Sequence, residues 1–440
     1  MSRVKEAFKS VLIVLLIISG MVLTVKTWVY DPSMLPGDFY EKTGRLLSYI
    51  GIDISIPGAV TVESRRIHNT QEAARPIRCA IKLPDGRYGA EYDSTLVSQV
   101  YDKTKRLVGE AIGSGSEPVE VSQKEWRQAL GHIGIYYDYL ADIPMSAIAI
   151  WQNYEPSSHI KSSAQHIILA VDGETVGLYY TSGAKDRYMF SKTALNPDDL
   201  ADVLTDYSAN GCVFTFEDGT VDPDAMDELF LFEGQPVRLA SSSRQQYDES
   251  GFTSLLKAFG MGLSSARYTQ SDNTIVAVDR ARTLTLSGRG DLVYSDSGED
   301  KSGEMVIYVS KPKVEEIVET VRIITEQTAG PLSGDAEISL VRFEYDASKD
   351  EYVVAFDYNL NGIPVILSSL SNAATFRIRG GVLVYSHIQL RTFMFEDDTY
   401  RPMPIKTAIV LGKKGANCSL CYSERDTGGE TNLDIGWYSR

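Results

Sequence analysis

The chain has 440 residues and a formal net charge of −16, from 59 acidic and 43 basic side chains. This acidity argues against a nucleic-acid-binding protein, because a negative surface repels phosphate backbones and anionic lipid headgroups alike; a protein partner or a basic ligand is favoured. The hydrophobic content of 43 %, with 25 Tyr and 14 Phe, is high enough to fill sizeable cores and excludes a disordered chain.

The first thirty residues predict a membrane anchor. Arg3, Lys5 and Lys9 precede an apolar run at 11–25, and positive residues in front of a span place the N-terminus in the cytoplasm. We therefore expect a cytoplasmic stub and single transmembrane helix within 1–30, and residues 31–440 outside the cell membrane. A cleaved signal peptide stays open as the alternative, although no small-x-small cleavage pattern follows the run.

The end of this segment predicts how the helix sits in the bilayer. A span needs about 20 mostly apolar residues, so Lys26 has to snorkel outward while Trp28 and Tyr30 lie in the interfacial aromatic belt. Gly20 and Thr24 form a small-xxx-small pair, a spacing that lets two membrane helices approach closely. The predicted membrane-helix contact therefore consists of Gly20 and Thr24, and the predicted interface anchors are Lys26, Trp28 and Tyr30.

Beyond the anchor, the pattern predicts three extracytoplasmic α+β modules at 31–160, 161–312 and 313–440, each an antiparallel sheet with packed helices. In the first, strands at 76–83 and 87–92 flank a turn, a helix covers 96–112, and Ser122 with Glu125 forms a capping box. In the second, we expect a hairpin at 166–171 and 175–180, a helix capped by Asn196, a strand at 212–216 and a helix at 254–259.

The last third of the sequence contains two similar segments, an internal repeat that we call the echo. Three blocks recur in the same order, namely 267–268 with 342–343, 275–279 with 353–357, and 292–295 with 383–386. The later copy carries a 13-residue insertion that includes 361–364, and a helical apolar pattern at 314–324 lies between the copies. We expect each unit to be a helix packed on an antiparallel meander, which makes a duplication the working hypothesis.

No sequence motif predicts catalysis, a metal site or a cofactor. The five histidines, His68, His132, His159, His166 and His387, show no metal-pair spacing, and no nucleophile elbow or phosphate loop is present. Cys418 and Cys421 have CxxC spacing, but on a strand they point to opposite faces, so Cys418 is expected on the inner face with Leu420 and Tyr422. The sequence thus predicts a protein that is not an enzyme.

Several passages together resemble the YycH family. They are the Lys26, Thr27, Trp28 and Tyr30 belt, the run 274–279 followed by 282–286 and Gly290 to Tyr294, and the passages 343–365, 376–385 and Leu433 to Trp437, which are similar to a C-terminal module shared with YycI.

This resemblance implies a membrane-anchored accessory protein. Family members adjust an essential cell-wall-sensing histidine kinase of Gram-positive bacteria, the YycFG (WalRK) two-component system, through membrane-helix and exterior contacts. The implied partners are the sensor kinase and a YycI-like protein. Two alternative functions stay open: a cell-wall or polysaccharide-binding module, and an envelope enzyme of unrecognised type. The sequence also leaves open whether regulation is positive or negative, whether an external ligand binds, and whether the protein is a dimer.

Overall fold

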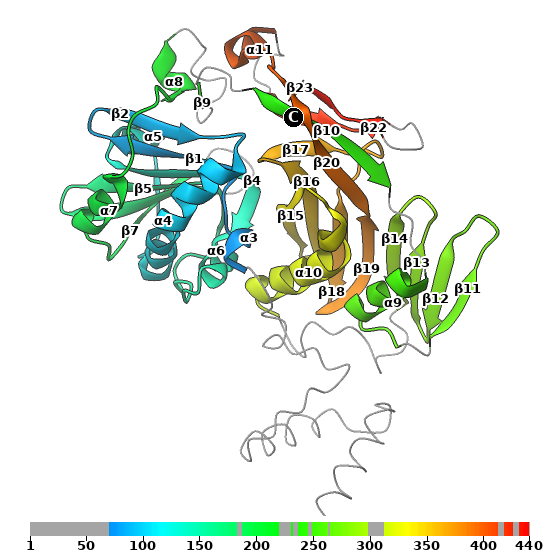
Figure 1. Ribbon diagram of the computed structural model, residues 1–440. Helices are drawn as coiled ribbons and strands as arrows, with labels where there is room; N and C mark the ends of the chain where they lie inside the picture. Colours follow the sequence, from blue (N-terminus) through cyan, green and yellow to red (C-terminus); the bar gives the residue numbers. More distant parts are fainter. Residues whose placement is uncertain are drawn as a thin grey trace, which may run out of the picture. The chain divides into compact units, whose positions relative to one another are not determined.

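The computed structural model describes residues 70–182, 187–219, 230–231, 236–244, 249–262, 265–297, 312–411, 418–425 and 431–439. Within these ranges the fold is α+β, with antiparallel sheets and packed helices, as the sequence predicts (Figure 1). The predicted anchor, with Gly20, Thr24, Lys26, Trp28 and Tyr30, lies outside the described residues.

The N-terminal sheet has seven strands in the order β2-β1-β4-β5-β6-β7-β3, all antiparallel. Its strands are β1 (Arg78–Leu83), β2 (Gly86–Ala90), β3 (Val119–Val121), β4 (Gly134–Pro144), β5 (Ser163–Asp172), β6 (Thr175–Thr181) and β7 (Tyr188–Lys192). The helices of this region are α3 (Thr70–Ala73), α4 (Ser94–Ser114), α5 (Gln123–Gly131), α6 (Met145–Trp151), α7 (Pro197–Leu204) and α8 (Thr215–Asp218).

Local signals account for most of these elements. The Ser122 and Glu125 capping box begins α5, and Asn196 caps α7 ahead of Pro197, both as predicted. The predicted strand at 212–216 is wrong in length. Strand β8 (Val213–Phe214) ends after two residues, where the Glu217 carboxylate accepts the Phe214 backbone N–H at 2.9 Å and starts α8.

Both faces of the N-terminal sheet are buried. Alternate residues of β1 show this, because Cys79 and Ile81 belong to the main core while Ala80 belongs to a second cluster on the other face. Trp126 of α5 is fully buried in that second cluster.

A second sheet has eleven strands and occupies the C-terminal half. They are β11 (Ala266–Thr269), β12 (Ile275–Asp279), β13 (Arg282–Leu286), β14 (Asp291–Asp296), β15 (Glu337–Asp346), β16 (Glu351–Leu360), β17 (Ile363–Ile366), β18 (Ala374–Arg379), β19 (Val382–Gln389), β21 (Cys418–Ser423) and β23 (Asp434–Ser439). Strands β17 and β21 run parallel, whereas the other pairs are antiparallel.

Smaller elements complete the described fold. Strands β20 (Arg391–Tyr400), β10 (Val237–Arg244) and β22 (Thr431–Asn432) form a three-stranded sheet, and β8 pairs with β9 (Phe230–Leu231). The remaining helices are α9 (Glu249–Ala258), α10 (Val314–Thr328), the 3₁₀ turn η2 (Gly330–Leu332) and α11 (Ile405–Leu411).

The two copies of the echo adopt the same topology. We call α9 with β11 to β14 the first repeat unit, and α10 with β15, β16, β18 and β19 the second repeat unit. In the first unit Arg267 lies opposite Ala277, and in the second Arg342 lies opposite Ala355, so even the strand register is repeated. The last strands of the units, β14 and β19, pair antiparallel, and α9 contacts α10. The units are therefore arranged as in a symmetric dimer, which supports the duplication hypothesis.

Two features distinguish the second repeat unit. Its insertion forms the turn after β16 and strand β17. A register shift after Arg377 leaves Val384 without a partner on β18, so Tyr385 is only half-buried although Tyr294, its counterpart by sequence, is fully buried. A bulge of one residue turns the following side chains to the other face.

The predicted boundaries at residues 160 and 312 both fall within sheets. Strand β4 pairs with β5 across the first, and β14 pairs with β19 across the second. The three-module division stays a prediction, because strand pairing does not measure independent folding.

Strand β21 is likewise buried on both of its faces. Leu420 and Tyr422 lie in the main core, as predicted, while Cys421 on the opposite face is equally buried.

Candidate functional site

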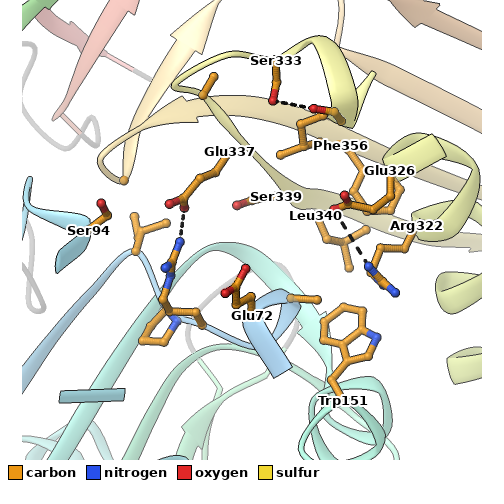
Figure 2. A pocket seen from close by; sticks show the side chains of 18 of the residues that line it. Glu72, Ser94, Trp151, Arg322, Glu326, Ser333, Glu337, Ser339, Leu340 and Phe356 are labelled. Carbon is orange, nitrogen blue, oxygen red and sulfur yellow. Dashed lines mark hydrogen bonds and ion pairs between the residues drawn. The ribbon is translucent and has the colours of Figure 1, made fainter. Parts of the chain in front are cut away.

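A cavity of about 220 Å³ lies where the start of the N-terminal region meets the second repeat unit. We call it the charged cavity. Its walls come from α3 and the segment before β1, from the starts of α4 and β15, and from the C-terminal ends of α6 and α10. Figure 2 shows Glu72, Glu337, Arg322 and Trp151 around it.

One wall of the charged cavity is a fixed polar network. Arg322 donates two hydrogen bonds of 2.8 Å to Glu319, one turn earlier on α10, and the indole N–H of Trp151 donates to the same carboxylate at 2.8 Å. All three residues are buried. Because the carboxylate and the guanidinium neutralise each other with their hydrogen bonds satisfied, the pair is tolerated away from water and ties α6 to α10.

The opposite wall is held by a second ion pair. Arg75 contacts Glu337 of β15 and donates a hydrogen bond to Ser98 at 2.7 Å. Nearby, Ser94 donates to the Asn361 side chain at 3.0 Å, in the turn that the insertion supplies.

Gly362 in the same turn has a φ of 79°. A Cβ atom there would lie 2.6 Å from the backbone oxygen of Ile77. The insertion of the second repeat unit thus reaches the N-terminal region at a point where only glycine fits.

Glu72 and Glu326 also face the charged cavity. Glu72 has no ion pair within the described ranges, and the nearest cation to Glu326 is Arg322, at 3.9 Å. Partial burial raises the pKa of Glu326; Arg322 opposes this rise, and Glu72 and Glu319 add to it. The negative charges of Glu72 and Glu326 therefore repel each other, although both side chains are exposed to solvent.

A second charged cluster lies within the N-terminal sheet. The Asp138 side chain on β4 is fully buried, contacts Arg78 of β1, and lies 3.4 Å from Nε2 of His166 on β5. Burial alone raises the pKa of Asp138, but Arg78 and His166 outweigh it and hold the pKa below 3.8. On the other ring nitrogen, His166 lies 3.2 Å from the Thr181 hydroxyl, which accepts the His166 backbone N–H. These contacts cross-link β1, β4, β5 and β6.

Glu91, directly after β2, belongs to the same cluster. It is 8 % exposed, and its Oε2 lies 3.9 Å from Arg78. Burial raises the pKa of Glu91 to about 7; Arg78 opposes the rise and Asp138 adds to it.

The described histidines lie in different parts of the fold. His132 and His159 lie at the surface, and His387 pairs with Asp291 on β14 at 3.7 Å. His68 lies outside the described residues. Among the described side chains, no cluster of His, Cys, Asp or Glu has the arrangement of a metal site. The helices described here include none long and apolar enough to cross a membrane.

The sequence predicted neither the charged cavity nor the charged cluster around Asp138. The Glu319 and Arg322 pair carries a local signal, because oppositely charged residues three apart can meet on a helix. The cavity carries no such signal, since its walls come from distant parts of the chain.

The described residues define a class: a mixed α+β protein of two large sheets, with an internal repeat of a helix and four strands. No protein-family model matches the chain, and no curated protein matches it either. Among solved structures, the chain is similar to the crystal structure of YycH from Bacillus subtilis. The TM-score is 0.51 with 12 % identical residues, over 84 % of this chain and 95 % of that one. The chain therefore has a YycH-like fold, which confirms the fold that the sequence resemblance implies.

Proposed function

We propose that this chain is a membrane-anchored extracytoplasmic accessory protein that regulates a cell-wall-sensing two-component histidine kinase. The observation that carries the proposal is the fold shared with 95 % of the YycH chain. The anchor pattern and the family resemblance of the sequence support it independently. In this role the protein is not an enzyme, and it acts through contacts with the kinase and with a YycI-like partner.

We place one of these contacts in the membrane. Gly20 and Thr24 give the anchor a face of small residues, and association of helices in hydrocarbon depends on close packing. Lys26, Trp28 and Tyr30 hold the helix at its depth in the bilayer. A contact of about 1–2 kcal/mol is enough to shift a two-state kinase roughly five- to thirtyfold.

The test replaces Gly20 by isoleucine, which keeps the span apolar and blocks close approach. Val22→Ile, on a different side of the helix, is the matched control. We expect Gly20→Ile to reduce chemical crosslinking between this chain and the kinase in membranes, and to change kinase output, while Val22→Ile leaves both unchanged.

Two further variants separate the anchor from the ectodomain, one with a scrambled anchor and one with residues 31–440 on an unrelated anchor. If all three altered anchors support normal kinase output and deletion of the gene still changes it, the membrane contact is refuted and the ectodomain alone regulates.

A further inference from the structure

A buried carboxyl group lies close to the contact between the N-terminal region and the second repeat unit. Glu91, directly after β2, is 8 % exposed, and its Oε2 accepts no hydrogen bond from any described residue. Arg78 of β1 forms an ion pair with this oxygen at 3.9 Å, but the same guanidinium already contacts Asp138 of β4. An ionised Glu91 is therefore a buried charge with little to compensate it.

The groups that act on Glu91 come from the neighbouring elements. They are Arg78 on β1, Asp138 on β4, Tyr92 next to Glu91 in sequence, and Cys212 in the segment before β8. Burial is the main cause that raises the pKa of Glu91 to about 7, because the opposing effect of Arg78 is smaller and Asp138 adds to the rise. His166 joins this group through Asp138, which lies 3.4 Å from its Nε2. The carboxyl group of Glu91 therefore gains or loses its proton near neutral pH.

Arg78 is connected directly to the second repeat unit. Ile77, the preceding residue, has its backbone oxygen 2.6 Å from the position that a Cβ atom at Gly362 would occupy. The Ile77 backbone N–H donates to the backbone oxygen of Asp138 at 2.9 Å. A shift of Arg78 or Asp138 therefore moves the backbone that packs against Gly362.

Glu91 is connected to the same turn by a short, constrained segment. Tyr92 has a φ of 56°, a left-handed conformation that bulky residues adopt rarely. Asp93 caps α4 by accepting two backbone N–H groups of its first turn, and Ser94 donates to the Asn361 side chain at 3.0 Å. This segment has little conformational freedom and links Glu91 to the turn of the second repeat unit.

We propose that this arrangement is a pH-sensitive contact, in which ionisation of Glu91 loosens the N-terminal region from the turn at 361–362 and protonation restores it. The ionised carboxylate competes with Asp138 for Arg78, and both sides of this competition lead to residues that touch the turn. The contribution of protonated Glu91 is complete below its ordinary pKa of 4.5 and is lost as the pH rises to about 7. The inference concerns the fold alone and does not depend on the proposed regulatory role.

Hydrogen–deuterium exchange of the full-length protein in detergent, measured by peptide mass spectrometry, tests the proposal. The reporters are peptides that contain the protected amides of Ile77 and Gly362; the second donates to the Asn359 side chain at 3.0 Å. With a pKa of about 7 in the closed contact and 4.5 in an open one, the opening equilibrium rises about tenfold between pH 6 and pH 8. We therefore expect about tenfold faster exchange at pH 8, after correction for the intrinsic effect of pH on amide exchange, and no further rise at higher pH.

Glu91→Gln keeps the shape of the side chain and removes its charge, so the corrected exchange of both reporters is expected to be equal at pH 6 and pH 8. Glu174→Gln, in the exposed turn between β5 and β6, is the matched control and keeps the wild-type change. Peptides of β13 and β14 report global unfolding, and the contact amides are expected to exchange faster than the slowest amides of these strands at pH 8. Circular dichroism checks that the variants are folded.

Three results would overturn the proposal. The first needs no variant: equal corrected exchange of the two reporters in the wild-type chain at pH 6 and pH 8. The second is exchange of the contact amides at the same rate as the slowest amides of β13 and β14, which would mean that pH acts only on global unfolding. The third is a pH-dependent change that persists in folded Glu91→Gln, which would assign the effect to another group, such as His166.

Discussion

Replacing Glu91 by glutamine is expected to stabilise the protein at alkaline pH. Glu91 is buried beside Arg78 and Asp138, and burial raises its pKa from 4.5 to about 7. An acid whose pKa is higher in the folded state than in the unfolded state contributes its full stabilisation at a pH below the unfolded pKa. This contribution is lost as the pH rises through the folded pKa.

The size of the effect follows from the two pKa values. One pKa unit corresponds to about 1.4 kcal/mol, so a rise from 4.5 to about 7 means that the charged carboxylate costs roughly 3 kcal/mol once the pH exceeds 7. Glutamine has nearly the same shape and carries no charge. We therefore expect Glu91→Gln to gain about 1–3 kcal/mol at pH 8 and almost nothing at pH 4.5.

Urea denaturation followed by circular dichroism, at pH 4.5 and pH 8, measures this difference. Glu174→Gln removes an exposed carboxylate and is expected to change stability at neither pH. If Glu91→Gln were equally stabilising at both pH values, or destabilising at pH 8, the argument from burial would be refuted.

Three other predictions concern packing and topology. Gly134→Ala is expected to cost about 1–3 kcal/mol in thermal melts, because its Cβ would lie 2.2 Å from the Leu169 backbone oxygen. Trp151→Phe removes the indole hydrogen bond to the buried carboxylate of Glu319, and we expect a loss of about 1–3 kcal/mol by the same assay; a fully stable variant would contradict the role of this bond. Protease treatment of intact protoplasts is expected to remove residues 31–440, and survival of the full-length chain would contradict the predicted topology.

Signals between residues close in sequence predicted much of the fold. The capping box at Ser122 and Glu125 and the N-cap at Asn196 fix helix starts through hydrogen bonds within one turn. The repeat was also visible, since the order of apolar and turn residues in each copy encodes its meander. The equal registers at Arg267 and Arg342 show how closely that order translates into pairing.

Features that depend on distant residues escaped prediction. Tyr385 matches Tyr294 in sequence, but a bulge that no local pattern announces turns it to the other face. Trp151 and Glu319 are 168 positions apart, and only the docking of α6 on α10 brings them together. The charged cavity is likewise a product of tertiary packing, so its residues look like ordinary surface charges in the sequence.

The most direct test of the regulatory account measures the phosphorylated response regulator of the cell-wall-sensing system in living cells. We compare wild type, a strain that lacks this gene, and the same strain complemented with the full-length chain. The account predicts that deletion changes the phosphorylated fraction about fivefold or more and that the full-length chain restores it. An identical phosphorylated fraction in all three strains would contradict the account.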